Sequence, residues 1–160
     1  MNIKKILDEN FLIFTLLYTF LYILFIATFP LPFPLIILTS SIFNPFIATM
    51  ISTVSITLGS MFFFIVFFKL HLDKIFTLKN IKKSKIFLKI KKNELLAVSI
   101  FRLTGGGGLP FVIQNIILVY SRIKLNNFVI GTFIGILPSI FLLSLLGLGI
   151  FEGLKLLLEY

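Results

Sequence analysis

The chain has 160 residues, of which 58% are hydrophobic and 13% are charged, and its mean hydropathy is +1.11. A soluble domain carries about twice that share of charged residues, and a core of this size cannot bury so many apolar side chains. The composition therefore excludes a soluble domain and a disordered chain, and it indicates an integral membrane protein. Because cysteine is absent and histidine occurs once, we expect no metal and no other cofactor.

The basic charge balance points to lipid rather than to nucleic acid. Lysine and arginine number 15 against 6 aspartate and glutamate residues, which gives a net charge of +9. These cations flank the apolar runs, as Lys4 and Lys5 do before the first. Flanking cations set membrane topology and contact anionic headgroups. We therefore expect anionic membrane lipids as partners, and no nucleic acid.

The first apolar run covers residues 11–29 and is long enough to cross a hydrocarbon core of about 30 Å. It exceeds the hydrophobic region of a signal peptide, about 7–15 residues, and no small-residue cleavage site follows it. We predict a retained first transmembrane helix over residues 11–29, preceded by a cytoplasmic segment 1–10.

The second apolar run, residues 33–68, is divided by Asn44 and Pro45. Proline lacks an N–H donor and fits the first turn of a helix, so the chain should break there and start a new helix. Residues 33–43 are too short to cross a bilayer. Residues 45–68 form the second predicted span.

A second broken stretch covers residues 94–121. Two short apolar pieces flank the sequence Thr104-Gly-Gly-Gly-Gly-Leu-Pro110. Four consecutive glycines carry a high cost in backbone entropy, so we expect no helix across them.

The third predicted span covers residues 128–150, after which residues 151–160 form a short tail. Glycines and a proline inside this span allow close packing or bending. The structural positions that we single out along the chain are Asn44, Pro45, Gly59, Gly131, Gly135 and Pro138.

These elements predict an all-α integral membrane fold with three full transmembrane helices and two broken re-entrant helical hairpins. Irregular backbone at membrane depth is tolerated where protein or a water-filled cavity satisfies it, as in transporters with discontinuous helices. In the alternative, each broken stretch is a kinked helix and the chain has four ordinary spans. The prolines and the glycine run favour the hairpins.

Lysine and arginine also predict the orientation. Three basic clusters are expected to be cytoplasmic: the N-terminus, the lysine-rich segment 69–94, and Arg122 with Lys124. All three can lie on that side only if residues 94–121 enter and leave the bilayer at the same face. Segment 69–94 fits an interfacial segment on the anionic inner leaflet, and a solvated loop is the alternative.

A loose internal similarity favours an inverted repeat. The tripeptide Leu31-Pro32-Phe33 returns as Leu109-Pro110-Phe111, and residues 44–49 resemble residues 127–132. Transporter folds are often built from two such copies of opposite orientation.

Arg102 is the most informative residue, because a cation inside a membrane segment costs about 2.5–3.5 kcal/mol on insertion scales. Its guanidinium can hold a phosphate through two parallel hydrogen bonds. Glycine amides and side-chain amides close by in the sequence can complete such a site. The predicted binding residues are Arg102, Gly106, Gly107, Pro110, Gln114 and Asn115. In the alternative, Arg102 extends to the interface and the amides cap the hairpin backbone.

Catalysis has little support in the sequence. The six carboxylates lie near the ends of apolar runs, and no base accompanies the many serines and threonines. The glycine run lacks the Gly-Lys-Ser/Thr ending of a nucleotide-binding loop. We expect that the protein is not an enzyme.

At this point the residues resemble a known family. Arg102, the run from Gly106 to Asn115, Phe128 and residues 131–138 resemble the DedA / VTT-domain family, also called SNARE-associated Golgi proteins. Upstream, residues 30–43, Leu58-Gly59 and Phe68-Lys69 resemble the first half of its domain. The similarity covers residues 30–150.

The resemblance implies a multi-pass protein of the cell membrane with two opposed re-entrant hairpins. It also implies movement of a lipid phosphate, either a polyprenyl phosphate or a phospholipid, between leaflets. Among the departures from the family pattern are a first hairpin without a carboxylate and a short segment after the last span. These two departures favour the alternative of a membrane scaffold or subunit that does not transport. Such a protein would pack through its hairpins against a second copy of itself or against a partner subunit.

Overall fold

The computed structural model describes residues 10–28, 31–69 and 93–158, and every element in them is a helix. In chain order the helices are α2 (Phe11–Thr28), α3 (Pro32–Ile42), α4 (Pro45–Lys69), α6 (Glu94–Leu103), α7 (Gly105–Gly108), α8 (Phe111–Tyr120) and α9 (Leu125–Leu158). Three of them, α2, α4 and α9, are long and apolar enough to cross a membrane. The predicted all-α fold with three such helices is confirmed.

Helix α3 runs back along α2. The ring of Phe43, just after α3, lies 5.9 Å from the ring of Phe11 at the start of α2. Further along, the hydroxyl groups of Tyr18 and Thr39 share a hydrogen bond of 2.8 Å. The chain therefore turns back between α2 and α3, which we call the first helix pair, although α2 packs mainly on α4 and α3 packs mainly on α9 and α4. From the sequence, α2 was expected to stand apart from the first hairpin, because an apolar run carries no information about its neighbours.

The predicted break at Asn44-Pro45 is confirmed. The side chain of Asn44 accepts a hydrogen bond of 2.9 Å from the N–H of Ile47, and Pro45 is the first residue of α4. An asparagine cap followed by proline is a favourable helix start. Along α4, Gly59 lies so close to α2 that an added Cβ would be 2.7 Å from the Cβ of Ile26. Helices α2 and α4 therefore start at the same end of the bundle and run in the same direction.

Helices α6 and α8 form the second antiparallel pair. At their open end, the Glu94 carboxylate accepts hydrogen bonds from the N–H of Lys124 at 3.1 Å and from Asn127 Nδ2 at 2.7 Å. This contact joins the start of α6 to the start of α9. The two ends of the predicted second hairpin thus lie together, as its sequence predicts.

The glycine run differs from its expectation. Gly105–Gly108 form the short helix α7, a single turn, where we expected no helix. This turn is not continuous with α6 or α8, because its first and last residues have positive φ angles, +60° at Gly105 and +85° at Gly108. Glycine adopts such angles without the penalty that a Cβ brings. The chain therefore breaks here as predicted, although the break contains one helical turn.

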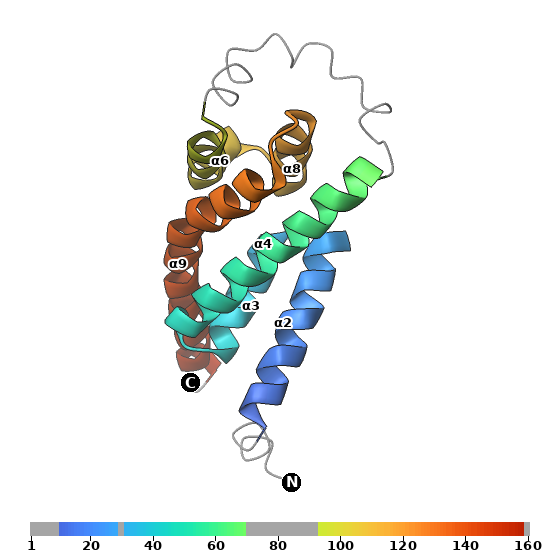
Figure 1. Ribbon diagram of the computed structural model, residues 1–160. Helices are drawn as coiled ribbons and strands as arrows, with labels where there is room; N and C mark the ends of the chain where they lie inside the picture. Colours follow the sequence, from blue (N-terminus) through green and yellow to red (C-terminus); the bar gives the residue numbers. More distant parts are fainter. Residues whose placement is uncertain (1–9, 29–30, 70–92, 159–160) are drawn as a thin grey trace.

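Helix α9 packs against both pairs and curves around the bundle (Figure 1), with Pro138 inside it. Proline removes one helical hydrogen bond and bends a helix. An added Cβ would be 2.7 Å from Val98 at Gly131, and would contact Ser40 Oγ at Gly147. The helix continues to Leu158, so most of the predicted tail 151–160 belongs to α9.

Helices α4 and α9 pack against each other and run in opposite directions (Figure 1). Helix α4 follows the pair α2/α3, and α9 follows the pair α6/α8. The second half of the chain therefore repeats the order of the first half, and its long helix runs in the opposite direction. This is the arrangement that an inverted repeat predicts.

The arrangement also changes the expected topology. The start of α2 and the end of α4 at Lys69 lie at opposite ends of the bundle (Figure 1). We expected both on the cytoplasmic side, from the positions of the lysines, and the parallel course of α2 and α4 disagrees with that placement. Residues 1–9 and 70–92 of the predicted cytoplasmic segments lie outside the described residues.

Candidate functional site: a cavity with a buried arginine

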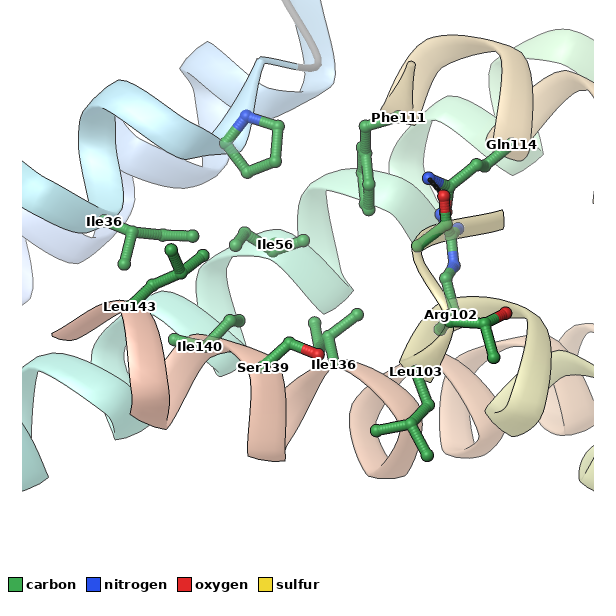
Figure 2. A pocket seen from close by; sticks show the side chains of 13 residues that line it. Ile36, Ile56, Arg102, Leu103, Phe111, Gln114, Ile136, Ser139, Ile140 and Leu143 are labelled. Carbon is green, nitrogen blue, oxygen red and sulfur yellow. Dashed lines mark hydrogen bonds between the residues drawn. The ribbon is translucent and has the colours of Figure 1, made fainter. Parts of the chain in front are cut away.

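A cavity of about 360 Å³ lies where the turning ends of the two helix pairs approach each other. Figure 2 shows residues that line it. They come from the start of α3, the end of α6, the starts of α7 and α8, and the middle of α4 and α9: Pro32, Ile36, Ile56, Arg102, Leu103, Thr104, Gly105, Phe111, Gln114, Ile136, Ser139, Ile140 and Leu143. Both broken elements therefore contribute to one cavity.

Arg102 contributes the charge of this cavity and is only 3% exposed. Its Nη1 donates to Gln114 Oε1 at 3.3 Å, and its Nη2 donates to Asn115 Oδ1. The guanidinium carbon lies 4.4 Å from the ring centre of Phe111 and 5.6 Å from that of Phe128. Cation–π contact with the two rings supports the charge where water is excluded.

Two polar atoms of this cluster are buried without a hydrogen-bond partner among the described residues, namely Arg102 Nε and Asn115 Nδ2. A buried donor without a partner costs about 1–3 kcal/mol, and more when it is charged. Both donors are enclosed by protein atoms, so a ligand in the cavity reaches Arg102 Nε only if neighbouring side chains move.

Gln114 connects the arginine to the glycine turn. Its Nε2 donates to the carbonyl oxygens of Gly105 at 3.0 Å and Leu109 at 2.8 Å, while its Oε1 accepts from Arg102. The amide group thus holds both ends of the turn and fixes one side of the guanidinium. Part of the alternative prediction is correct, because this amide does cap the backbone of the second pair.

Within the side chains that the structure describes, Glu94 is the one carboxylate, and it does not neutralise Arg102. Glu94 lies about 12 Å away along α6 at 1.5 Å per residue, and its carboxylate is occupied by Lys124 and Asn127. The hydrogen bonds of the guanidinium go to neutral amides. Its positive charge is therefore not balanced by a described side chain.

The predicted binding residues lie around the second turn. Arg102, Gln114 and Asn115 come together as one hydrogen-bonded cluster, although Asn115 lies behind Arg102 and does not line the cavity. The other three predicted residues belong to the turn itself, with Gly106 and Gly107 inside α7 and Pro110 immediately before α8.

The predicted structural positions act in helix contacts. Asn44 and Pro45 start α4, Gly59 brings α4 close to α2, and Gly131 brings α9 close to α6. Gly135 matters most for the site, because an added Cβ there would meet the Ser99 carbonyl oxygen and would lie 2.7 Å from the Cβ of Arg102. The close approach at Gly135 therefore sets the position from which Arg102 extends.

Sequence reasoning named no residue of the first pair as part of this cavity. Pro32 and Ile36 from α3 line it together with Ile140 from α9. The similarity between the Leu-Pro-Phe tripeptides at 31–33 and 109–111 was the one signal, since it marks both turning points. Ile36 and Ile140 have no such signal, because isoleucine in an apolar run is uninformative by itself.

The comparison with known families decides the identity. The sequence matches the family model described as the VTT domain over residues 29–149. The chain belongs to the VTT-domain family. The matched residues run from the first turn to the later part of α9, so the VTT domain contains every residue that lines the cavity. No curated protein and no solved structure matches the chain.

Proposed function

We propose that this VTT-domain protein resides in the cell membrane, binds the phosphate group of a membrane lipid at Arg102 and moves that lipid between leaflets. The observation that carries the proposal is the buried guanidinium of Arg102, which lines the cavity between both helix pairs and has only neutral hydrogen-bond partners. A buried cation without a counter-ion favours an anionic ligand strongly.

The donors at Arg102 suit a phosphate oxygen. Nε has no partner among the described residues, and the bond from Nη1 to Gln114 is long at 3.3 Å. A phosphate accepting from Nε and Nη1 gains two charge-assisted hydrogen bonds and replaces one weak contact. Hydrogen bonds of this type are about twice as strong as those between neutral groups.

The arrangement of the pairs suits movement between leaflets. The pair α2/α3 has its open end at the start of α4, and the pair α6/α8 has its open end at the end of α4. Separation of one pair at a time would expose the cavity toward one end of the bundle and then toward the other. Alternating exposure of one central site is the general scheme of inverted-repeat transporters.

One observation favours a second candidate, a membrane scaffold that does not transport. Arg102 joins α6 to α8 through Gln114 and Asn115, and this bridge has a structural use without any ligand. A scaffold would bind a partner subunit or a second copy through its helix pairs. The experiment below separates the two functions.

The test is leaflet exchange in liposomes that contain the purified protein and a fluorescent lipid phosphate. We expect Arg102→Gln to slow exchange by at least about tenfold, as loss of a charged hydrogen-bond donor costs about 1.5–3 kcal/mol. Arg122→Gln removes a positive charge that is exposed and outside the cavity, and it should leave the rate unchanged. Equal exchange by the wild type and Arg102→Gln would refute the proposal. Absence of exchange by the wild type, together with crosslinking to a stoichiometric partner, would favour the scaffold.

A further inference from the structure

The cavity has two chemically different ends. At one end lie Arg102 and Gln114, and at the other lie Ile36, Ile140 and Leu143, which we name the apolar arm (Figure 2). A cavity with a charged end and an apolar end is complementary to an amphiphile that lies along it. The orientation of such a ligand follows from the lining, with the anion at Arg102 and the hydrocarbon in the apolar arm.

The side chains of the apolar arm are mostly packed against other protein side chains. Ile36 and Ile140 are each 3% exposed, and Ile56 in the middle of the cavity is 1% exposed. Beyond the arm, α3 and α9 touch, since an added Cβ at Gly147 would meet Ser40 Oγ. A hydrocarbon chain in the arm would therefore leave the bilayer and lie between α3, α4 and α9.

The opposite end of the cavity is the accessible one. Leu103 is 50% exposed, and Thr104 and Gly105 beside it are also exposed. The cavity volume of about 360 Å³ is at the lower end of the range for small-molecule sites, about 300–1,000 Å³. It has room for a small anionic group and a segment of one chain, and not for a large headgroup as well.

We infer that the protein holds part of the lipid's own hydrocarbon chain in the apolar arm while Arg102 holds the phosphate. This inference rests on the proposed function and adds a subsite to it: selection by the chain as well as by the headgroup. The ligand class is a phosphate ester with a small headgroup and at least one flexible chain. For an alkyl phosphate that is dissolved in water, each methylene group moved into the arm contributes about 0.8 kcal/mol, so the affinity for such probes should rise with chain length until the arm is full.

The test uses alkyl phosphates as probes and tryptophan as a reporter, because the chain contains no tryptophan. Leu143→Trp places the reporter in the apolar arm, and Leu142→Trp places it on the neighbouring position, which is 62% exposed. Dodecyl phosphate brominated on its last carbon quenches a tryptophan that it contacts. We expect saturable quenching of Leu143→Trp that unbrominated dodecyl phosphate reverses, and only unsaturable quenching of Leu142→Trp.

A second measurement covers the case in which Leu143→Trp itself fills the arm. Calorimetric titration compares dodecyl and butyl phosphate on the wild type and on Ile140→Phe. Phenylalanine takes up about one methylene group more room than isoleucine, which should weaken dodecyl phosphate by about fourfold and leave butyl phosphate within about twofold.

The two hypotheses fail in different ways. If alkyl phosphates bind, lose affinity with Arg102→Gln, quench both reporters alike and ignore Ile140→Phe, the phosphate site stands and the chain subsite is refuted. If Arg102→Gln leaves the binding of every alkyl phosphate unchanged, the proposed function is refuted as well.

Discussion

The carboxylate of Glu94 accepts a hydrogen bond from the backbone N–H of Lys124 at 3.1 Å, and this contact closes the open end of the second helix pair. It fixes where α6 starts relative to α9, while the Arg102 bridge fixes where α6 ends relative to α8. The orientation of the buried guanidinium depends on both contacts.

The first prediction concerns this closure. Glu94→Ala removes the acceptor for Lys124 and Asn127, and should lower the free energy of unfolding by about 1.5–3 kcal/mol, the usual value for hydrogen bonds to a charged group. Glu94→Gln keeps one acceptor oxygen and should lose less. Thermal unfolding in detergent, followed by circular dichroism, measures the difference. Identical melting of Glu94→Ala and the wild type would show that the contact does not hold the pair.

The second prediction concerns the approach of α9 to α6. In Gly135→Ala, the new Cβ would meet the carbonyl oxygen of Ser99 and lie 2.7 Å from the Cβ of Arg102. Overpacking of this kind costs about 1–3 kcal/mol, and it should also slow lipid exchange because Arg102 moves.

Gly149→Ala is the matched control for this substitution, since nothing lies within 4 Å of an added Cβ there. Alanine in a helix is favoured over glycine by about 1 kcal/mol, so this variant should be as stable as the wild type or more stable. The same melting experiment compares the two variants. A loss of stability in Gly149→Ala as large as in Gly135→Ala would contradict the packing argument.

The third prediction supplies Arg102 with an internal counter-ion. In Gln114→Glu, a carboxylate oxygen replaces the amide oxygen that accepts from Nη1 at 3.3 Å. The fold should persist, because the ion pair strengthens the bridge, although the two bonds from Nε2 to the glycine turn are lost. Binding of alkyl phosphates should fall by at least about tenfold, since the site no longer carries a net charge. Undiminished phosphate binding by Gln114→Glu would rule out a charge-based site.

Much of the chain's division into helices could be predicted from local chemistry. Proline after asparagine marks the start of α4, and the run of four glycines at 105–108 marks the turn before α8. These features act over a few residues, and the sequence displays them directly. The cluster of Arg102, Gln114 and Asn115 could be anticipated for the same reason, because polar side chains in an apolar segment need partners close by.

The arrangement of the helices in space could not be predicted in the same way. The contact between Gly59 and Ile26, together with that between Phe11 and Phe43, shows that α2 and α4 are parallel. None of these residues indicates that direction in the sequence, because each lies in an apolar run. The distribution of lysines predicted the opposite arrangement. The sequence also does not predict that Ile36 and Ile140 line the cavity, because their positions depend on the register between α3 and α9.

The fourth prediction therefore addresses topology. Asn10 lies at the start of α2, beside the start of α4, whereas Arg122 follows α8 near the end of α4 (Figure 1). Single-cysteine variants at these positions are interpretable because the chain contains no cysteine. An impermeant maleimide should label Asn10→Cys and Arg122→Cys from opposite sides of a sealed vesicle. Labelling of both from the same side would restore the topology expected from the lysines.

The meeting of the two turns at Arg102 is tested most directly by crosslinking across the cavity in lipid vesicles. Pro32 and Thr104 line the cavity from the first and the second pair, respectively. We predict that a short bifunctional thiol reagent joins Pro32→Cys to Thr104→Cys within one chain, and that dodecyl phosphate slows the reaction. The control combination, Pro32→Cys with Arg122→Cys, should not react. Crosslinking of the control combination without crosslinking of Pro32→Cys to Thr104→Cys would contradict the account.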